Sequence, residues 1–431
     1  MTPHESLALV AGWFAIFLIL GQNVATVLMG AGLVGIYVLM GPRLFDGLLA
    51  QDIVFTATSY SLSIVPLYLL MAQFLLRGKV VEDLFLVGYR LAGRRRFPLG
   101  AATIVSGGLL GAVSGSGAAT AAALATMASP QLQAVGYTRR FSIAVAAVAG
   151  SLSAVIPPSI IMIIYGSLTL VPVGHLFIGA LLPGLVCVAV YIFCVHLFAE
   201  TSPPAEGGTA DAAPSGGAVA AFVFVILLMT VVFGGIYGGV VTAAEAGGLG
   251  AFAALVGMLA MRRIGLRDIF EALGDSVKVT SMLMLIVMGA QVFGRFLSLS
   301  RAPRELLAYA EPLLATPGLL VAILLLVFFL FGLFLESAAV MVLLLPIIMP
   351  LLDAAQVDLL WFGVMACFMI SLGLLTPPVG LSTYAACAAA GHPVAPIFNR
   401  TAKFAVAAAI LVTLMMVMAP GTVTWLPRQM Q

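Results

Sequence analysis

Long apolar runs separated by short polar segments dominate the chain. A membrane-spanning helix needs about 20 predominantly apolar residues. Two apolar stretches, 99–129 and 318–350, are interrupted midway by polar or small residues and are expected to be re-entrant hairpins. The uninterrupted runs predict about ten spans, near 6–21, 24–40, 60–76, 140–169, 174–198, 218–237, 242–261, 278–298, 358–390 and 404–426.

Composition supports lipid as the solvent of this chain. Of its 431 residues 62% are hydrophobic and 8% are charged, whereas a soluble domain carries roughly a quarter of its residues as charged side chains. The four cysteines, all in apolar runs, have no metal-site spacing and are interpreted as packing residues. No nucleophile, phosphate-binding or ATPase motif is present, so we expect neither an enzyme nor a cofactor, and no nucleic-acid partner.

Basic residues near the span ends predict the orientation. Placing their four groups in the cytoplasm is consistent with ten spans and two hairpins, and it leaves both termini outside. The groups are Arg77, Lys79, Arg90 and 94–96; Arg139 and Arg140; Arg262, Arg263 and Arg267; and Arg400 and Lys403.

The chain repeats with a shift of 220 positions. The shift takes Pro157 to Pro377, and it places Ser116 on Glu336 at the two hairpin breaks. An odd number of spans between equivalent positions predicts that the second half enters from the opposite side, as in many inverted-repeat transporters. The predicted division is a first half at 1–198, a Pro/Gly/Ala-rich flexible linker at 199–217 and a second half at 218–431. Each half holds scaffold helices, a hairpin and a broken helix, the latter near 140–169 and 358–390.

Each predicted broken helix has a proline pair in mid-membrane. Proline removes a helix hydrogen bond, so the carbonyls of four residues are expected to lack helix partners: Ser153, Ala154, Gly373 and Leu374. Orphan carbonyls in lipid are costly, and a dehydrated sodium ion is a natural partner for them. The alternative is a simple kink whose carbonyls are satisfied by neighbouring residues.

The hairpin breaks carry the other candidate groups. The first offers hydroxyls and free N–H groups at a half-helix start, which attracts anions, in Ser114, Gly115, Ser116, Gly117 and Thr120. Small-residue helix packing is the alternative for this segment. At the second break, Glu336 is the only carboxylate deep in an apolar run of the second half and is expected to bind sodium or carry a proton, unless it faces water.

Two further charged residues have less direct interpretations. Glu245 follows Thr242 at the spacing of a capping box, and capping is favoured over transport. Arg295 lies near one end of its span and is a candidate partner for a substrate carboxylate.

The order of these motifs resembles the large membrane subunit of tripartite ATP-independent periplasmic (TRAP) transporters over nearly the whole chain. In the first half the run Gly-Ala-Val-Ser-Gly-Ser-Gly-Ala-Ala-Thr from Gly111 is followed by Gly-Tyr-Thr-Arg-Arg-Phe from Gly136 and Ile-Pro-Pro-Ser-Ile from Ile156. The second half has Gly-Leu-Phe-Leu-Glu-Ser-Ala-Ala from Gly332 and Gly-Leu-Leu-Thr-Pro-Pro-Val-Gly from Gly373.

This resemblance implies a multi-pass permease of the bacterial inner membrane, driven by sodium ions as coupling ions and working by an elevator mechanism. It implies an organic acid (carboxylate) substrate, a separately supplied small membrane (Q) subunit and a soluble periplasmic substrate-binding (P) protein. Candidate sodium ligands, from the resemblance and from the breaks, are Ser114, Ser116, Gly150, Ser153, Pro158, Glu336, Ser337, Gly373, Thr376 and Pro378. Two departures from the family pattern are Gly117, where a second serine is frequent, and the pair Glu336-Ser337, where aspartate-proline or a similar pair is usual.

Two other functions are compatible with the same pattern. A stand-alone sodium–carboxylate symporter with two hairpins would need no binding protein. An ion channel fits less well, because channels usually assemble one shared pore, whereas this chain carries two pseudo-symmetric sites.

Overall fold

The computed structural model describes residues 3–41, 56–92, 95–203 and 216–430, together with positions 47, 53 and 54. Within these residues the chain is helical almost throughout, and the one β-bridge joins Tyr137 to Thr201. Most of the predicted linker, residues 204–215, lies outside the described residues. The expectation of an all-α polytopic fold is confirmed.

The first half of the chain contains nine α-helices in the described residues, with short 3-10 turns at Tyr60–Ser63 (η1) and Leu152–Ala154 (η2). The α-helices are α1 (Pro3–Ile19), α2 (Val24–Met40), α4 (Ile64–Arg77), α5 (Val80–Ala92), α6 (Arg96–Ser114), α7 (Gly117–Ala134), α8 (Arg139–Ser151), α9 (Ile160–Thr169) and α10 (Val173–Leu197).

The second half follows the same order and adds one short helix at its end. Its helices are α11 (Gly216–Tyr237), α12 (Ala243–Ala260), α13 (Leu266–Leu299), α14 (Ala302–Leu314), α15 (Pro317–Gly332), α16 (Ser337–Ala354), α17 (Leu359–Gly373), α18 (Leu381–Ala389), α19 (Ala395–Met418) and α20 (Gly421–Arg428).

Six helices of the described residues are by themselves long and apolar enough to cross a membrane: α10, α11, α12, α13, α16 and α19. Shorter apolar helices account for most of the other predicted spans. The spans predicted at 140–169 and 358–390 are each divided between two helices, α8 with α9 and α17 with α18, because the proline pairs end the first helix of each.

Two predicted boundaries were wrong. The span placed at 278–298 belongs to the 34-residue helix α13, which begins twelve residues earlier. Its first turns carry Glu271 and Asp275, so the apolar pattern of the sequence does not extend to the start of the helix. Both carboxylates pair with Arg77 of α4 at 2.5 Å. The last span was placed at 404–426, but α19 runs from Ala395 to Met418 and a separate helix begins after Pro420.

Equivalent helices of the two halves keep nearly constant spacing. The helices α7 and α16 both have 18 residues and begin 220 positions apart, at Gly117 and Ser337. The same 220 positions separate the starts of α8 and α17, at Arg139 and Leu359. The spacing that the sequence showed in single residues is therefore present in whole helices.

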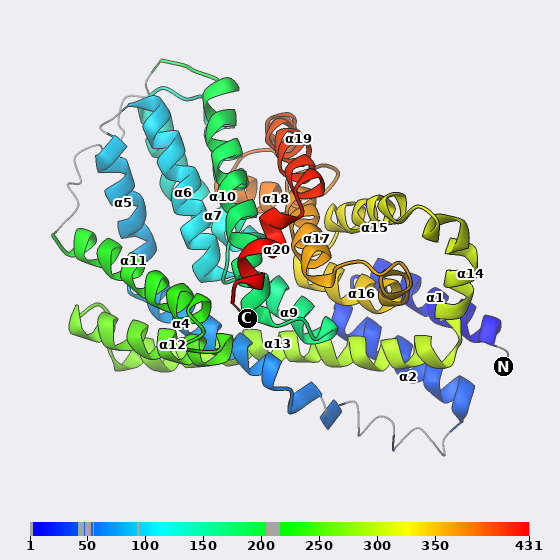
Figure 1. Cartoon of the computed structure of the whole chain (residues 1–431). Coiled ribbons are helices and arrows are strands. Elements are labelled where there is room, and N and C mark those ends of the chain that lie inside the picture. The colour runs from blue at the N-terminus through cyan, green and yellow to red at the C-terminus, as the bar shows by residue number, and fades with distance from the viewer. Residues whose placement is uncertain are drawn as a thin grey trace.

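The two halves are interleaved in space. Helix α2 packs along α13 and α4 packs along α12, while α7 packs on α18 and α9 on α16. Figure 1 shows the first of these pairs, with blue α2 beside yellow-green α13. Each pair takes one helix from each half, so the sequence halves are not separate bodies.

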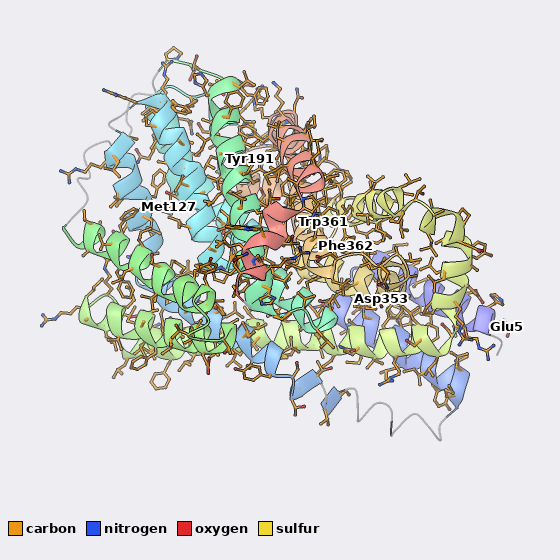
Figure 2. The ribbon with its side chains drawn as sticks, viewed as in Figure 1. Glu5, Met127, Tyr191, Asp353, Trp361 and Phe362 are labelled. Carbon is orange, nitrogen blue, oxygen red and sulfur yellow. The ribbon has the colours of Figure 1, made fainter. Side chains whose placement is uncertain are left out.

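The halves meet at equivalent residues in the core. Ser371 Oγ of α17 donates a hydrogen bond to the Ser151 carbonyl of α8 at 2.8 Å, and these fully buried residues are 220 positions apart. A contact between equivalent residues lies on a pseudo-two-fold axis. At the start of α17, Trp361 Nε1 donates to the Met416 carbonyl at 2.9 Å, and Phe362 is fully buried (Figure 2).

Candidate functional site

The first hairpin tip forms a tight turn between α6 and α7. Gly115 adopts a left-handed conformation with φ +65°, and a Cβ there would lie 2.5 Å from the Ile160 side chain. Ser116 is the N-cap of α7, and its hydroxyl accepts a hydrogen bond from the Ala119 N–H at 3.4 Å. Only glycine combines this backbone conformation with this close approach. The predicted break at this tip is confirmed.

The second tip places Glu336 where the 220 shift expects it, as the N-cap of α16. One carboxylate oxygen accepts a hydrogen bond from the Ala338 N–H at 2.9 Å. The Glu336 side chain is exposed, although it lies among helices of the interior. The carboxylate lines a space that water and ions can enter.

The proline breaks are confirmed, and three of the four carbonyls expected to lack helix partners accept a hydrogen bond from another donor near the break. Ser159 Oγ donates to the Ala154 carbonyl at 3.1 Å, the Thr376 N–H donates to Gly373, and the Ser382 N–H donates to Leu374, both at 3.1 Å. The expected loss of helix partners is confirmed for Ala154 and Leu374, whose donors are not N–H groups of the same helix, while Gly373 accepts from a turn three residues on. Polar residues close to the prolines replace the donors that the helix lost. Ion binding at the breaks must therefore rest on hydroxyls or on second lone pairs.

One cavity of about 230 Å³ brings together predicted site residues that are far apart in sequence. Both hairpin tips reach it, the first proline break forms one wall, and α13 closes the opposite side. Its lining includes Gly115, Ser116, Ser153, Ala154, Glu336, Ser337 and Ala338, with Val279, Met282 and Leu283 from α13.

Ser382 was missed by the sequence analysis. A Cβ at Gly117 would lie 3.0 Å from Ser382 Oγ and 3.2 Å from Ser153 Oγ, so both hydroxyls converge beside the start of α7. Ser382 is fully buried, and its Oγ has no hydrogen-bond partner among the described residues. The 220 shift pairs it with Met162, so the repeat gave no sign of a polar role.

Several other candidates do not line the cavity. Gly150 and Gly373 are positions of close helix packing: a Cβ would lie 2.6 Å from Ala121 at the first and 2.6 Å from Gly332 at the second. Pro158 and Pro378 shape the breaks, where both proline–proline bonds are cis. The hydroxyl of Thr120 is 2.6 Å from Ser114 Oγ within the first hairpin. Thr376 Oγ1 donates to the Leu372 carbonyl at 2.8 Å.

Arg295 also lies away from the cavity. It is twelve residues beyond Leu283 on α13, which at 1.5 Å per residue is about 18 Å along the helix. Glu245 has the role that the sequence favoured: its carboxylate accepts a hydrogen bond from the Thr242 N–H at 2.7 Å in a complete capping box.

The cavity combines two kinds of binding group. Hydroxyl, carbonyl and carboxylate oxygens suit a hard cation, and the N-terminus of α7 suits an anion. Among the described residues no group of three His, Cys, Asp or Glu side chains could hold a metal. The cavity therefore offers oxygen atoms and helix termini rather than a transition-metal site.

Fold and site together define an all-helical, multi-spanning membrane protein with two hairpins of equivalent position whose tips share an internal cavity. The family model of the tripartite ATP-independent periplasmic transporter, DctM component, matches residues 11–421. The chain belongs to this family of TRAP transporter large permeases, as its motifs had suggested.

Relatives of similar identity are named for different solutes. The chain is 29% identical over 339 residues to the C4-dicarboxylate TRAP transporter large permease DctM of Pseudomonas aeruginosa, covering 78% of this chain and 79% of that protein. It is 28% identical over 407 residues to the ectoine permease TeaC of Halomonas elongata, covering 92% and 94%. The sialic acid permease SiaM of Vibrio cholerae is 28% identical over 341 residues, covering 78% and 79%.

Among solved structures, the YdaH transporter of Alcanivorax borkumensis has the same fold. The TM-score is 0.65 at 12% sequence identity, and the match covers 88% of this chain and 89% of that one. At this identity the likeness concerns the fold alone.

Proposed function

We propose that this chain is the membrane permease that carries an organic acid into the bacterial cell across the inner membrane, coupled to sodium ions. The substrate is delivered by a soluble periplasmic binding protein, and a small membrane subunit completes the assembly. The observation that carries the proposal is the cavity in which Ser116, Ser153 and Glu336 meet. Family membership supports the partners and the substrate class.

The cavity suits a cation and an anion bound side by side. A sodium ion beside the Glu336 carboxylate takes the serine hydroxyls as further ligands, while a substrate carboxylate faces the N–H groups at the start of α7. The sodium ion offsets the repulsion between the Glu336 carboxylate and the substrate carboxylate, so the binding of sodium and the binding of substrate strengthen each other.

The way the helices pack supports an elevator motion as the mechanism. Hairpin and broken-helix segments of both halves contact one another through α7–α18 and α9–α16, whereas α2–α13 and α4–α12 form a second group. The cavity lies between the first group and α13. Sliding the first group along α13 would carry the bound ions across the membrane, and the site would never be open to both sides of the membrane at once.

Charge balance sets a minimum for the coupling. Moving one charge across 100 mV is worth about 2.3 kcal/mol, so entry of a dianion into an inside-negative cell is opposed by roughly 4.6 kcal/mol at 100 mV. Two sodium ions cancel this opposition and a third makes uptake electrogenic. We therefore expect at least two cations per dianionic substrate.

The test is uptake of labelled carboxylates into proteoliposomes that hold this chain and its small membrane partner. Each substrate is measured with and without an inward sodium gradient, and with and without the binding protein. Uptake that requires both supports the tripartite transporter. Uptake that requires sodium but no binding protein would establish the stand-alone symporter instead. Uptake that is equal with and without a sodium gradient would exclude sodium as the coupling ion.

Glu336→Gln tests the site itself. It should weaken the sodium dependence of uptake while leaving expression unchanged, because the side chain keeps its shape and loses its charge. Glu311→Gln on the exposed face of α14 is the matched control. An unchanged sodium response in Glu336→Gln would exclude this carboxylate from the cation site.

A further inference from the structure

Basic side chains from three separate chain segments gather at one end of the helices that carry the first hairpin. We name this surface the basic end, and its cations are Arg95, Arg96, Arg139, Arg140, Arg400 and Lys403. They come from the start of α6, the start of α8 and the first turns of α19. In Figure 1, α10 ends at the top of the view, where its last residues join these segments.

Hydrogen bonds hold the segments of the basic end together. Arg96 Nε donates to the Val135 carbonyl at 2.8 Å, and the Thr138 N–H donates to the Glu200 carbonyl at 2.9 Å. Arg400 pairs with the Glu200 carboxylate at 2.7 Å. Across the surface, Arg139 Nη2 donates to the Ala390 carbonyl at 2.8 Å. The chain segments that carry the positive charges are therefore connected to one another.

The positive charge of this surface is mostly uncompensated. In its described segments the six cations face one carboxylate, Glu200, which Arg400 already engages. The carbonyls that bind Arg96 and Arg139 hold these side chains without neutralising them. Arg95 and Arg140 are exposed and have no ion-pair partner among the described residues. An excess of five positive charges remains for an anionic ligand.

Exposed apolar side chains lie directly beside these cations. On the last turns of α10, Phe193 is 57% and Leu197 59% exposed, and Lys403 lies over the ring of Phe198, 5.6 Å from its centroid. At the start of α6, Phe97 is 43% exposed and packs edge-on against His196. A small soluble anion would make no contact with these apolar side chains, whereas a phospholipid packs its acyl chains against them.

We propose that the basic end binds the phosphate headgroup of anionic phospholipids. The headgroup lies against Arg95 and Arg140, and the acyl chains lie along Phe193 and Leu197 of α10. Helix α6 belongs to the first hairpin, α8 packs against both of its helices, and α19 packs on α8. Anionic lipid thus holds one end of the group of helices that would move during transport, and the lipid composition sets the rate of that motion. The effect on rate rests on the proposed function, whereas lipid binding does not.

Binding is tested by native mass spectrometry of the purified chain in an equimolar mixture of phosphatidylglycerol and phosphatidylcholine. The wild type should retain phosphatidylglycerol selectively. In Arg95→Gln/Arg140→Gln the affinity for phosphatidylglycerol should fall by roughly fivefold for each charge removed, as expected for basic side chains at an anionic surface. Arg95→Lys/Arg140→Lys, which keeps both charges, should retain it.

The control removes the same charge elsewhere, in Arg301→Gln/Arg304→Gln at the start of α14, where both side chains are exposed. This variant should bind phosphatidylglycerol like the wild type. Undiminished binding in Arg95→Gln/Arg140→Gln, or an equal loss in the control, would overturn the proposal. Displacement of the lipid by millimolar inorganic phosphate would also overturn it, because the ligand would then be phosphate itself.

A separate measurement follows transport in liposomes of rising phosphatidylglycerol content. A rate that responds to this lipid in the wild type and less in Arg95→Gln/Arg140→Gln supports the regulatory role. Selective lipid binding with no transport under any condition would contradict the proposed function and leave the lipid site in place.

Discussion

Gly373→Ala tests whether the second hairpin packs as closely against the broken helix as the structure shows. Gly373 ends α17 and faces the backbone of Gly332, the last residue of α15. A Cβ at this position would lie 2.6 Å from the Gly332 carbonyl carbon, whereas carbon atoms pack at roughly 3.5–4.0 Å. The two backbones must therefore separate by about 1 Å, since no flexible side chain is available to move aside.

The expected cost is that of overpacking a well-filled core, about 1–3 kcal/mol. A loss of about 2 kcal/mol changes the ratio of folded to unfolded protein roughly 30-fold. Glu336 follows Gly332 by only four residues, so the displacement also moves its carboxylate. We expect a lower melting temperature together with weaker sodium dependence of uptake.

The assay is thermal unfolding of the detergent-purified protein, with Gly318→Ala as control. Gly318 lies in the same helix, α15, and a Cβ there would meet no atom within 4 Å. The control should melt like the wild type or slightly higher, because alanine favours a helix over glycine. A Gly373→Ala protein with an unchanged melting temperature would refute the close approach of α15 and α17.

Four further substitutions test other parts of the structure. Ser371→Ala removes the buried hydrogen bond to the Ser151 carbonyl and should destabilise the protein by about 1–3 kcal/mol, measured by thermal unfolding; an unaltered transition would contradict that contact. Ser382→Ala should reduce sodium affinity in uptake assays without lowering stability, because its Oγ has no partner among the described residues; loss of stability alone would make it a packing residue. Arg263→Gln and Asp83→Asn should each lower the melting temperature, and the double variant should lose less than the sum because the two side chains form one ion pair. Additive losses would show that the pair is not coupled.

The sequence located the breaks in the helices well, because each break has a local chemical cause. Proline pairs cannot continue a helix, and Ser116 is a preferred N-cap residue at the start of α7. Thr242 and Glu245 form the capping box that their spacing predicted. These outcomes depend on neighbours within a few residues along the chain.

Other features depended on contacts between distant parts of the sequence. The approach of Ser382 to Gly117 joins the two halves, and no local pattern encodes it. The early start of α13 was hidden because Glu271 and Asp275 look like loop residues until Arg77 pairs with them. The sequence predicted that the proline-break carbonyls lose helix partners but not which donors replace them, since donors such as Ser159 become available only when the chain bends back.

The interleaving of the halves bears on how an asymmetric site can arise from a symmetric ancestor. Two copies of a half-length chain packed in this way would form a two-fold dimer, with the Ser151–Ser371 contact on its axis. In such a dimer both hairpin tips would carry the same residue. Joining the copies into one chain lets the two tips diverge, so that a hydroxyl at 116 and a carboxylate at 336 face one cavity. A single chain can then bind an anion at one tip and its counter-ion at the other. Identical subunits cannot do this, because their tips carry the same residue.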